Sequence, residues 1–162
     1  MVENELTFLV KKLPDDFDNF LAKEIQQGYI TGLPNQLRLR NIGEKYILTR
    51  KSQIDRNDAR RYEEKELEIT KEEFEKLWSL CKNFIKKSRY FYPLPKGLMA
   101  EIDIYHDQLE GFLCVEVEFK NEEQRKNFKT PEWFGADVTQ EKWVANAELV
   151  NLSWEDVKGK IA

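Results

Sequence analysis

Pairs of like charges, separated by a single residue, recur along this sequence. The acidic pairs are Glu3/Glu5, Glu64/Glu66, Glu101/Asp103 and Glu116/Glu118, and the basic pairs are Arg38/Arg40 and Lys87/Arg89. Residues at positions i and i+2 of a β-strand lie about 6.6 Å apart on the same face. Any one such strand face is usually just exposed to solvent, because charged side chains are mostly exposed. A solvated face generally mixes the two signs, however, so the sorting of charge by strand favours a binding surface.

Carboxylates and arginines suit two different ligands. Carboxylate oxygens bind hard divalent cations, and the planar guanidinium fork of arginine matches the geometry of phosphate. If the strands form a sheet that closes with its charged faces inward, one tunnel would hold both the cations and a polyanion. The pattern therefore predicts a site for a metal-bound polyphosphate, with the apolar strand faces outside and covered by helices.

The elements that would position these residues are mainly strands. Alternating apolar and polar residues predict strands over residues 3–10, 36–40, 46–51, 62–69, 84–92, 98–105 and 112–119, with a hairpin turn at 42–45. Helical spacing predicts helices over 16–27, 70–81, 121–128 and 153–161. Gly28 is placed to end the first of these helices, and Thr70 with Glu73 forms a capping-box pattern. The polar residues 52–61 are expected to form a mobile loop.

Composition excludes several classes of protein. A chain of 162 residues has the size of one domain, and 12% aromatic residues are too many for a disordered chain. The net charge of −4 argues against general binding to DNA or to an anionic membrane. There is no long apolar run, and the N-terminal residues are acidic before they are apolar, unlike a signal peptide. Cys81 and Cys114 are therefore expected to be reduced core thiols of a cytoplasmic protein.

Eight short motifs follow one another in the order in which one enzyme family has them. They are Glu-x-Glu before an apolar strand (Glu3, Glu5), Arg-x-Arg (Arg38, Arg40), LTRK ending at Lys51, Glu-x-Glu-x-x-Ile (Glu64, Glu66), Lys-Ser-Arg-Tyr (Lys87, Arg89), Glu-Ile-Asp (Glu101, Asp103), Glu-Val-Glu (Glu116, Glu118), and WFGADVT followed by Lys142. Together they resemble the CYTH domain, also called the triphosphate tunnel metalloenzymes, from about residue 3 to residue 149. Each motif is weak alone, and the shared order carries the resemblance.

The resemblance implies both a fold and an activity. The fold would be α+β but mainly β: a closed eight-stranded antiparallel barrel with peripheral helices, in one domain over residues 1–162. The activity would be hydrolysis of a triphosphate by attack of water, dependent on Mg²⁺ or Mn²⁺, with inorganic tripolyphosphate as the first candidate substrate. The expected partner is this small molecule, without DNA or membrane, and the protein would be a monomer or a homodimer.

The resemblance also implies roles for individual residues. The expected metal ligands are Glu3, Glu5, Glu116 and Glu118, the expected phosphate-binding residues are Arg38, Arg40, Lys51, Lys87, Arg89 and Lys142, and the expected catalytic residues are Glu3, Glu5, Thr7 and Asp103. Lys142 could instead be an ordinary lysine at the start of a helix. Three further carboxylates could bind a second metal, orient water or pair with the arginines: Glu64, Glu66 and Glu101.

One residue departs from the family pattern. The family has Glu-x-Glu-x-Lys, and this chain has Thr7 where the lysine belongs. Threonine keeps a hydroxyl group but loses the charge, so two alternatives to a hydrolase stay open: a non-catalytic module that binds polyphosphate or nucleotide, and an adenylate cyclase of the class IV type. His106, the only histidine, is expected in a loop and not in a zinc site, and Ser52 and Ser88 show no histidine partner in the sequence.

Overall fold

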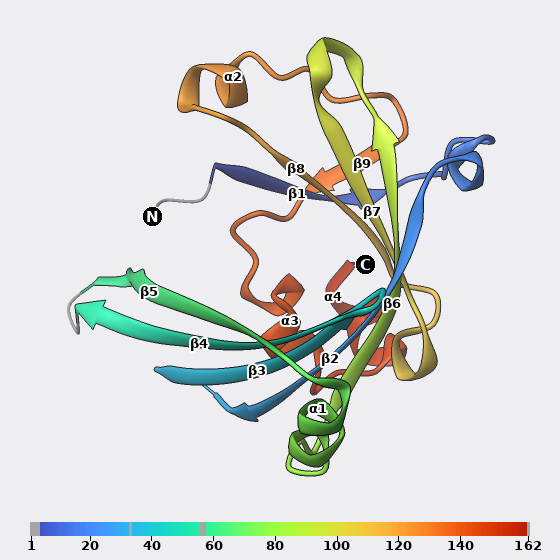
Figure 1. Ribbon diagram of the computed structural model, residues 1–162. Coiled ribbons are helices and arrows are strands. Elements are labelled where there is room, and N and C mark those ends of the chain that lie inside the picture. Colours follow the sequence, from blue (N-terminus) through green and yellow to red (C-terminus); the bar gives the residue numbers. More distant parts are fainter. Residues whose placement is uncertain (1–3, 33, 56–57, 162) are drawn as a thin grey trace.

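The computed structural model describes residues 4–32, 34–55 and 58–161. Within these ranges one antiparallel sheet runs in the order β5-β4-β3-β2-β6-β7-β8-β1-β9 (Figure 1). The strands are β1 (Glu5–Val10), β2 (Ala22–Thr31), β3 (Asn35–Ile42), β4 (Lys45–Asp55), β5 (Asp58–Ile69), β6 (Phe84–Pro93), β7 (Met99–Tyr105), β8 (Leu113–Glu118) and β9 (Phe134–Asp137). The mainly β fold class expected from the sequence is thereby confirmed.

Short helices connect and cover the strands. They are α1 (Lys71–Trp78), α2 (Glu122–Lys126), α3 (Asn146–Leu149) and α4 (Trp154–Ile161), with 3₁₀ turns η1 (Phe17–Asn19), η2 (Pro95–Gly97), η3 (Asp107–Leu109) and η4 (Lys142–Val144). The expected capping box begins α1, because Thr70 Oγ1 accepts from the N–H of Glu73 while the Glu73 carboxylate accepts from the N–H of Thr70. None of the helices in the described ranges is long and apolar enough to cross a membrane.

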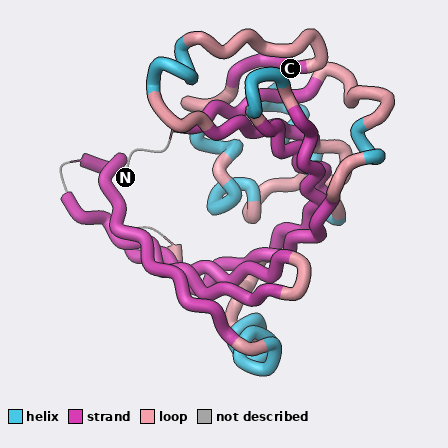
Figure 2. The backbone as a smooth tube through the Cα atoms, turned by 45° about the horizontal axis from the view of Figure 1, so that its top comes forward, coloured by secondary structure: helices cyan, strands magenta, loops and turns pink. Residues whose placement is uncertain are grey.

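The sheet curves strongly but does not close, so the expected closed eight-stranded barrel is not confirmed. Figures 1 and 2 show an open curve, with β4 and β5 along one side and β1, β8 and β9 along the other. Among the described residues, β5 pairs only with β4, and β9 pairs only with β1. β9 lies against the edge of β1 that a closed barrel would use for pairing with β5. The ladder therefore ends at β9, which has only four residues.

The two faces of this sheet differ in character. Strand alternation puts Arg38, Arg40, Lys87, Arg89 and Asp103 on the concave face, which we call the inner face. The register supports this placement, because residues that pair directly share a face, as Arg89 and Asp103 do. On the convex, outer face, Leu39 and Ile69 pack against Phe74 of α1. The sequence thus places charge inside the curve and an apolar layer outside, as the alternation predicts.

Two further apolar clusters pack against the sheet, one on its outer face and one at an end of its inner face. On the outer face of β1, β7 and β8, Phe8, Ile102, Val115 and Val117 are buried together with Phe134. At one end of the inner face, α3 and α4 contribute the apolar side chains that cover the sheet. The buried members of that cluster are Ile85, Tyr105, Leu109, Phe112, Cys114, Leu149, Val150 and Val157. The helices at the C-terminus therefore cover one end of the concave face with apolar side chains, and the charged residues occupy the rest of that face.

The helix predicted over residues 16–27 is wrong. Residues 17–19 form η1, and residues 22–31 form β2, which pairs with β3 on one side and β6 on the other. Sheet pairing outweighs the local helical spacing of Phe17, Phe20 and Leu21, since β2 is held by ladders on both edges. Gly28 does not end a helix: a Cβ there would lie 3.0 Å from the side chain of Cys81, so it allows close packing within the sheet.

The structure also differs from the sequence predictions in residues 52–61 and in two short elements. The stretch 52–61 is not a loop throughout, because β4 continues to Asp55 and β5 begins at Asp58; residues 56 and 57 lie outside the described part. Strands extended in this way carry the polar residues on a hairpin that projects beyond its neighbours (Figure 1). The sequence analysis also missed β9 and α3, each of only four residues, which is too short to produce a recognisable periodicity.

Candidate active site on the inner face

Asp103 lies at the centre of the charged cluster. Its Oδ2 accepts a hydrogen bond of 2.7 Å from Lys87 Nζ and one of 2.9 Å from Arg89 Nη2, and its Oδ1 accepts from Arg89 Nε at 2.7 Å. Both Lys87 and Asp103 have side chains that are 0% exposed. Burial by itself would raise the pKa of Asp103, but Lys87 and Arg89 outweigh it and hold that pKa below the ordinary value. Asp103 is therefore an anchor for two cations.

Arg89 joins this anchor to the acidic strands. Its Nη1 lies 3.0 Å from Glu101 Oε2, and its Nη2 lies 3.8 Å from Glu116 Oε2. Burial would lower the pKa of Arg89, but the bond to Asp103 and the two glutamates raise it. Burial, together with the charges of Glu116 and Asp103, raises the pKa of Glu101 despite the nearby Arg89. Of the three alternatives for Glu101, the structure thus shows pairing with an arginine.

Arg38 lies on the other side of the curve, against β4 and β5. Its Nη2 donates to Thr49 Oγ1 at 3.4 Å and lies 3.7 Å from Glu64 and 3.9 Å from Glu66. These long ion pairs are weak, since both glutamates are well exposed. Arg38 Nε is buried and has no hydrogen-bond partner among the described residues. A buried donor left unpaired costs free energy, and an acceptor oxygen from a bound anion would satisfy it.

Arg40 is adjacent to Arg38 on the same face and is held differently. Its Nε donates to Gln27 Oε1 at 3.1 Å, and no carboxylate lies within ion-pair distance of it among the described residues. Burial, followed by the like charges of Arg38 and Arg89, lowers the pKa of Arg40 to about 10. Arg38 and Arg40 of β3 thus concentrate positive potential on the inner face, and a polyanion would relieve their repulsion.

The expected metal ligands lie on β1 and β8. In the antiparallel register Glu5 is directly opposite Glu118, and Thr7 is directly opposite Glu116, which also faces Glu101 of β7. Glu3 lies outside the described residues. Like charges directly opposite one another destabilise a sheet, and a divalent cation bound by their oxygens would offset that repulsion. The carboxylates present on these strands therefore fit a divalent cation.

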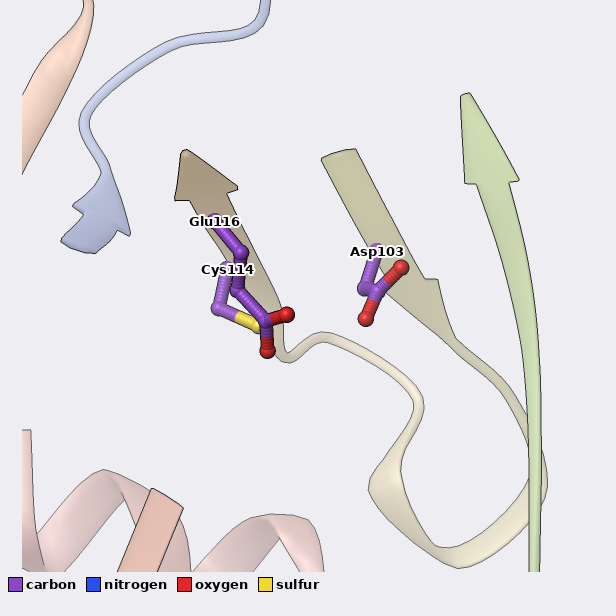
Figure 3. A group of neighbouring side chains, drawn as sticks. All are labelled: Asp103, Cys114 and Glu116. Atoms are coloured by element: carbon purple, nitrogen blue, oxygen red, sulfur yellow. The ribbon is translucent and has the colours of Figure 1, made fainter. Parts of the chain in front are cut away.

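A second group could be mistaken for the metal site. The ligand atoms of Asp103, Cys114 and Glu116 all lie within 4.8 Å of one another (Figure 3). Both oxygens of Asp103 are, however, occupied by Lys87 and Arg89. Burial, with the charges of Asp103 and Glu116, raises the pKa of the Cys114 thiol well above its ordinary value, so the thiol stays protonated. A hard cation prefers the oxygens of the neighbouring glutamates.

The remaining phosphate-binding candidates differ in placement. Lys51 of β4 is on the inner face, since it pairs in register with Glu64 and with Gln36. Lys142 begins η4 and is exposed, and no ion pair or hydrogen bond links its side chain to the inner face within the described chain. The structure thus brings Lys51 to the charged face with the arginines and does not show Lys142 there.

Sequence reasoning missed a polar group on the outer face. Ser88 has a histidine partner after all, because its Oγ lies 2.7 Å from His106 Nε2 and 2.6 Å from Glu24 Oε1. The serine lies between the other two groups, whereas a nucleophile triad needs the histidine in the middle. Since the hydroxyl donates its single proton to Glu24, His106 cannot accept it. This cluster therefore does not activate a nucleophile, and it faces away from the arginines.

The geometry defines a curved antiparallel sheet whose inner face carries arginines on one wall and paired carboxylates on the other. No family model matches the sequence. The chain is 36% identical over 152 residues to an inorganic triphosphatase of Nitrosomonas europaea, a match that covers 92% of this chain and 97% of that protein. It is 32% identical over 142 residues to an inorganic triphosphatase of Acetivibrio thermocellus, covering 85% of this chain and 88% of the other.

A solved structure agrees with these relatives. The crystal structure of an inorganic triphosphatase superposes with a TM-score of 0.74 at 35% identity, over 93% of this chain and 95% of that one. The chain belongs to the CYTH-like family of inorganic triphosphatases. The resemblance drawn from the eight motifs is confirmed at the level of the family.

Proposed function

We propose that this protein hydrolyses inorganic tripolyphosphate by attack of water on the inner face of the sheet, with Mg²⁺ or Mn²⁺ as cofactor. One observation supports this best: Arg38, Arg40 and Arg89 converge on the same face as the paired carboxylates of β1 and β8. The relatives named inorganic triphosphatase, which match nearly the whole chain, support the substrate.

Different side chains of the inner face would bind the phosphates, bind the metal ion and activate the water. Arg38, Arg40 and Lys51 would hold the chain of phosphates, and Arg89, fixed by Asp103, would hold its position beside the acidic wall. A divalent ion bound by Glu5, Glu116 and Glu118, with Glu3, would supply neutralisation of charge on the phosphate oxygens. A carboxylate of this wall would orient the attacking water and accept its proton. The water oxygen bonds to the terminal phosphorus, the anhydride bond breaks, and phosphate and diphosphate leave.

A panel of substrates tests the proposal. We expect the purified protein, with Mg²⁺ or Mn²⁺, to release phosphate from tripolyphosphate faster than from ATP or thiamine triphosphate. Cyclic AMP should be assayed in the same ATP reaction. Tight binding of tripolyphosphate without any release of phosphate would favour a non-catalytic module, and formation of cyclic AMP would favour a cyclase.

Thr7→Lys is expected to raise the rate of tripolyphosphate hydrolysis several-fold. Thr7 is opposite Glu116 in the register and follows Glu5 on the same face, so an amine there would remain protonated among carboxylates and attract the anionic substrate. The backbone N–H of Thr7 donates to Thr139 Oγ1 at 3.0 Å, a bond that a new side chain leaves intact. The measurement is kcat/KM for phosphate release.

Thr7→Met is the matched control, since it adds length without charge and should not raise the rate. A folded Thr7→Lys variant with lower turnover than the unmodified protein would show that the site is built around the hydroxyl. Tripolyphosphate would then lose its place as the first candidate substrate.

A further inference from the structure

Gln27 is a buried polar residue in the middle of the charged face that no motif singles out. It belongs to β2, its side chain is 0% exposed, and its strand neighbours in the register are Arg40 and Ile85. Both ends of its amide are used. Oε1 accepts from Arg40 Nε at 3.1 Å, and Nε2 donates to Tyr29 OH at 3.0 Å. The orientation of the amide follows from Arg40, because a guanidinium can only donate and therefore requires the amide oxygen, while the Tyr29 hydroxyl accepts from the amide nitrogen.

The two central arginines are therefore anchored by different chemistry. Arg89 donates from Nε and Nη2 to the carboxylate of Asp103, and Glu101 and Glu116 lie within 4 Å of its Nη atoms. Its charge is neutralised by the protein. Among the described residues, the one side-chain hydrogen bond of Arg40 is from its Nε to an uncharged acceptor. No carboxylate of the described chain pairs with this arginine, and burial, with the like charges of Arg38 and Arg89, lowers its pKa more than the negative charge of Glu66 raises it.

An uncharged anchor has a consequence for binding. A carboxylate at position 27 would hold the guanidinium more strongly, because charge-assisted hydrogen bonds are about twice as strong as neutral ones. It would also cancel the positive charge that an incoming anion needs, and it would place a negative charge beside the phosphates. An amide fixes the direction of Arg40 through one N–H and leaves its two Nη groups and its full charge for the ligand.

We propose that Gln27 is a positioning residue that aims Arg40 at the phosphate chain without neutralising it, and so sets the affinity of this site for polyanions. The inference rests on the proposed function only in taking a polyphosphate as the ligand. It assigns to Gln27 no contact with the substrate, since its polar atoms are already occupied by Arg40 and Tyr29.

The decisive variant is Gln27→Glu, which changes the charge and almost nothing of the shape. Binding of tripolyphosphate is measured by titration calorimetry in EDTA, so that neither turnover nor metal contributes. We expect Kd to rise by at least about tenfold, the size of one hydrogen bond to a charged group. The melting temperature should stay equal to that of the unmodified protein or rise, because the introduced carboxylate can pair with Arg40 and accept from the Tyr29 hydroxyl.

Gln26→Glu is the matched control. Gln26 is the preceding residue of the same strand, so its side chain is on the outer face, opposite Lys86 in the register. The variant has the same net charge as Gln27→Glu. Its Kd for tripolyphosphate should differ from that of the unmodified protein by less than about twofold, since a half-buried charge on the opposite face of the sheet is still partly screened by solvent.

A double-mutant cycle separates positioning from direct contact. Gln27→Leu removes the anchor and should raise Kd several-fold, but in an Arg40→Gln background the same change should have no further effect. An equal effect of Gln27→Leu in both backgrounds would overturn the proposal, because it would mean that Gln27 acts on the ligand without Arg40.

The outcomes distinguish this inference from the proposed function. Tight binding that weakens in Gln27→Glu but not in Gln26→Glu, without phosphate release in any assay, would support the inference and contradict the function. Hydrolysis by the unmodified protein together with an unchanged Kd in Gln27→Glu would support the function and overturn the inference. A protein that binds no tripolyphosphate would overturn both.

Discussion

Asp103→Asn is expected to lower the free energy of unfolding by about 3–5 kcal/mol, the cost of leaving a buried charge without its partner. Lys87 Nζ lies 2.7 Å from Asp103 Oδ2, and both side chains are fully buried. The amide removes the negative charge that compensates Lys87 and breaks the paired bonds to Arg89. The loss is measured as the shift in the midpoint of urea denaturation at constant slope.

Two further variants make this result interpretable. Glu72→Gln breaks an ion pair with Lys76 in which both side chains are well exposed, so its midpoint should hardly move. The double variant Lys87→Met with Asp103→Leu should be more stable than Asp103→Asn, because it leaves no charged lysine buried without a partner, and Arg89 keeps Glu101 and Glu116 nearby in both variants. A midpoint for Asp103→Asn equal to that of the unmodified protein would refute the role of Asp103 as an anchor.

Arg40→Gln should raise the Kd for tripolyphosphate between about tenfold and a hundredfold, the range for losing hydrogen bonds to a charged group. Arg40 has no carboxylate partner among the described residues, so removing it breaks no internal ion pair and leaves no unpaired acid. The protein should therefore stay folded while binding fails. Calorimetric titration measures the loss of binding, and a melting curve of the same sample shows whether the protein is folded.

Arg125→Gln controls for the loss of one positive charge. Arg125 is on α2, at the outside of the molecule, and pairs only weakly with Glu122. Its removal should leave the Kd almost unchanged at physiological ionic strength. If Arg40→Gln and Arg125→Gln bound tripolyphosphate as well as the unmodified protein does, the anion would not lie on the inner face.

Much of the inner face could be predicted because strand alternation has a period of two. Once β3, β6, β7 and β8 are located, the faces of Arg38, Arg89, Asp103 and Glu116 follow from their positions alone. Helix α1 could be predicted from its capping box and its apolar stripe, which are local signals.

Other features depend on contacts that are distant in the sequence. β2 resembles a helix locally and becomes a strand because β3 and β6 pair with both of its edges. Closure of the sheet depends on which strand pairs with the free edge of β1. In this protein that strand is β9, which has only four residues and is too short to be predicted from the sequence. The burial of Asp103 and its bonds to Lys87 and Arg89 result from neighbours on β6. The amide of Gln27 carries no charge and belongs to none of the paired patterns.

The dependence of activity on a divalent cation tests the central claim most directly. Phosphate release from tripolyphosphate should be followed before chelation, after exhaustive treatment with EDTA, and after addition of Mg²⁺ or Mn²⁺ in excess. The facing glutamates of β1 and β8 predict that activity falls to background with EDTA and returns with either ion. Undiminished phosphate release from the fully chelated protein would contradict the account of a metal-dependent triphosphatase.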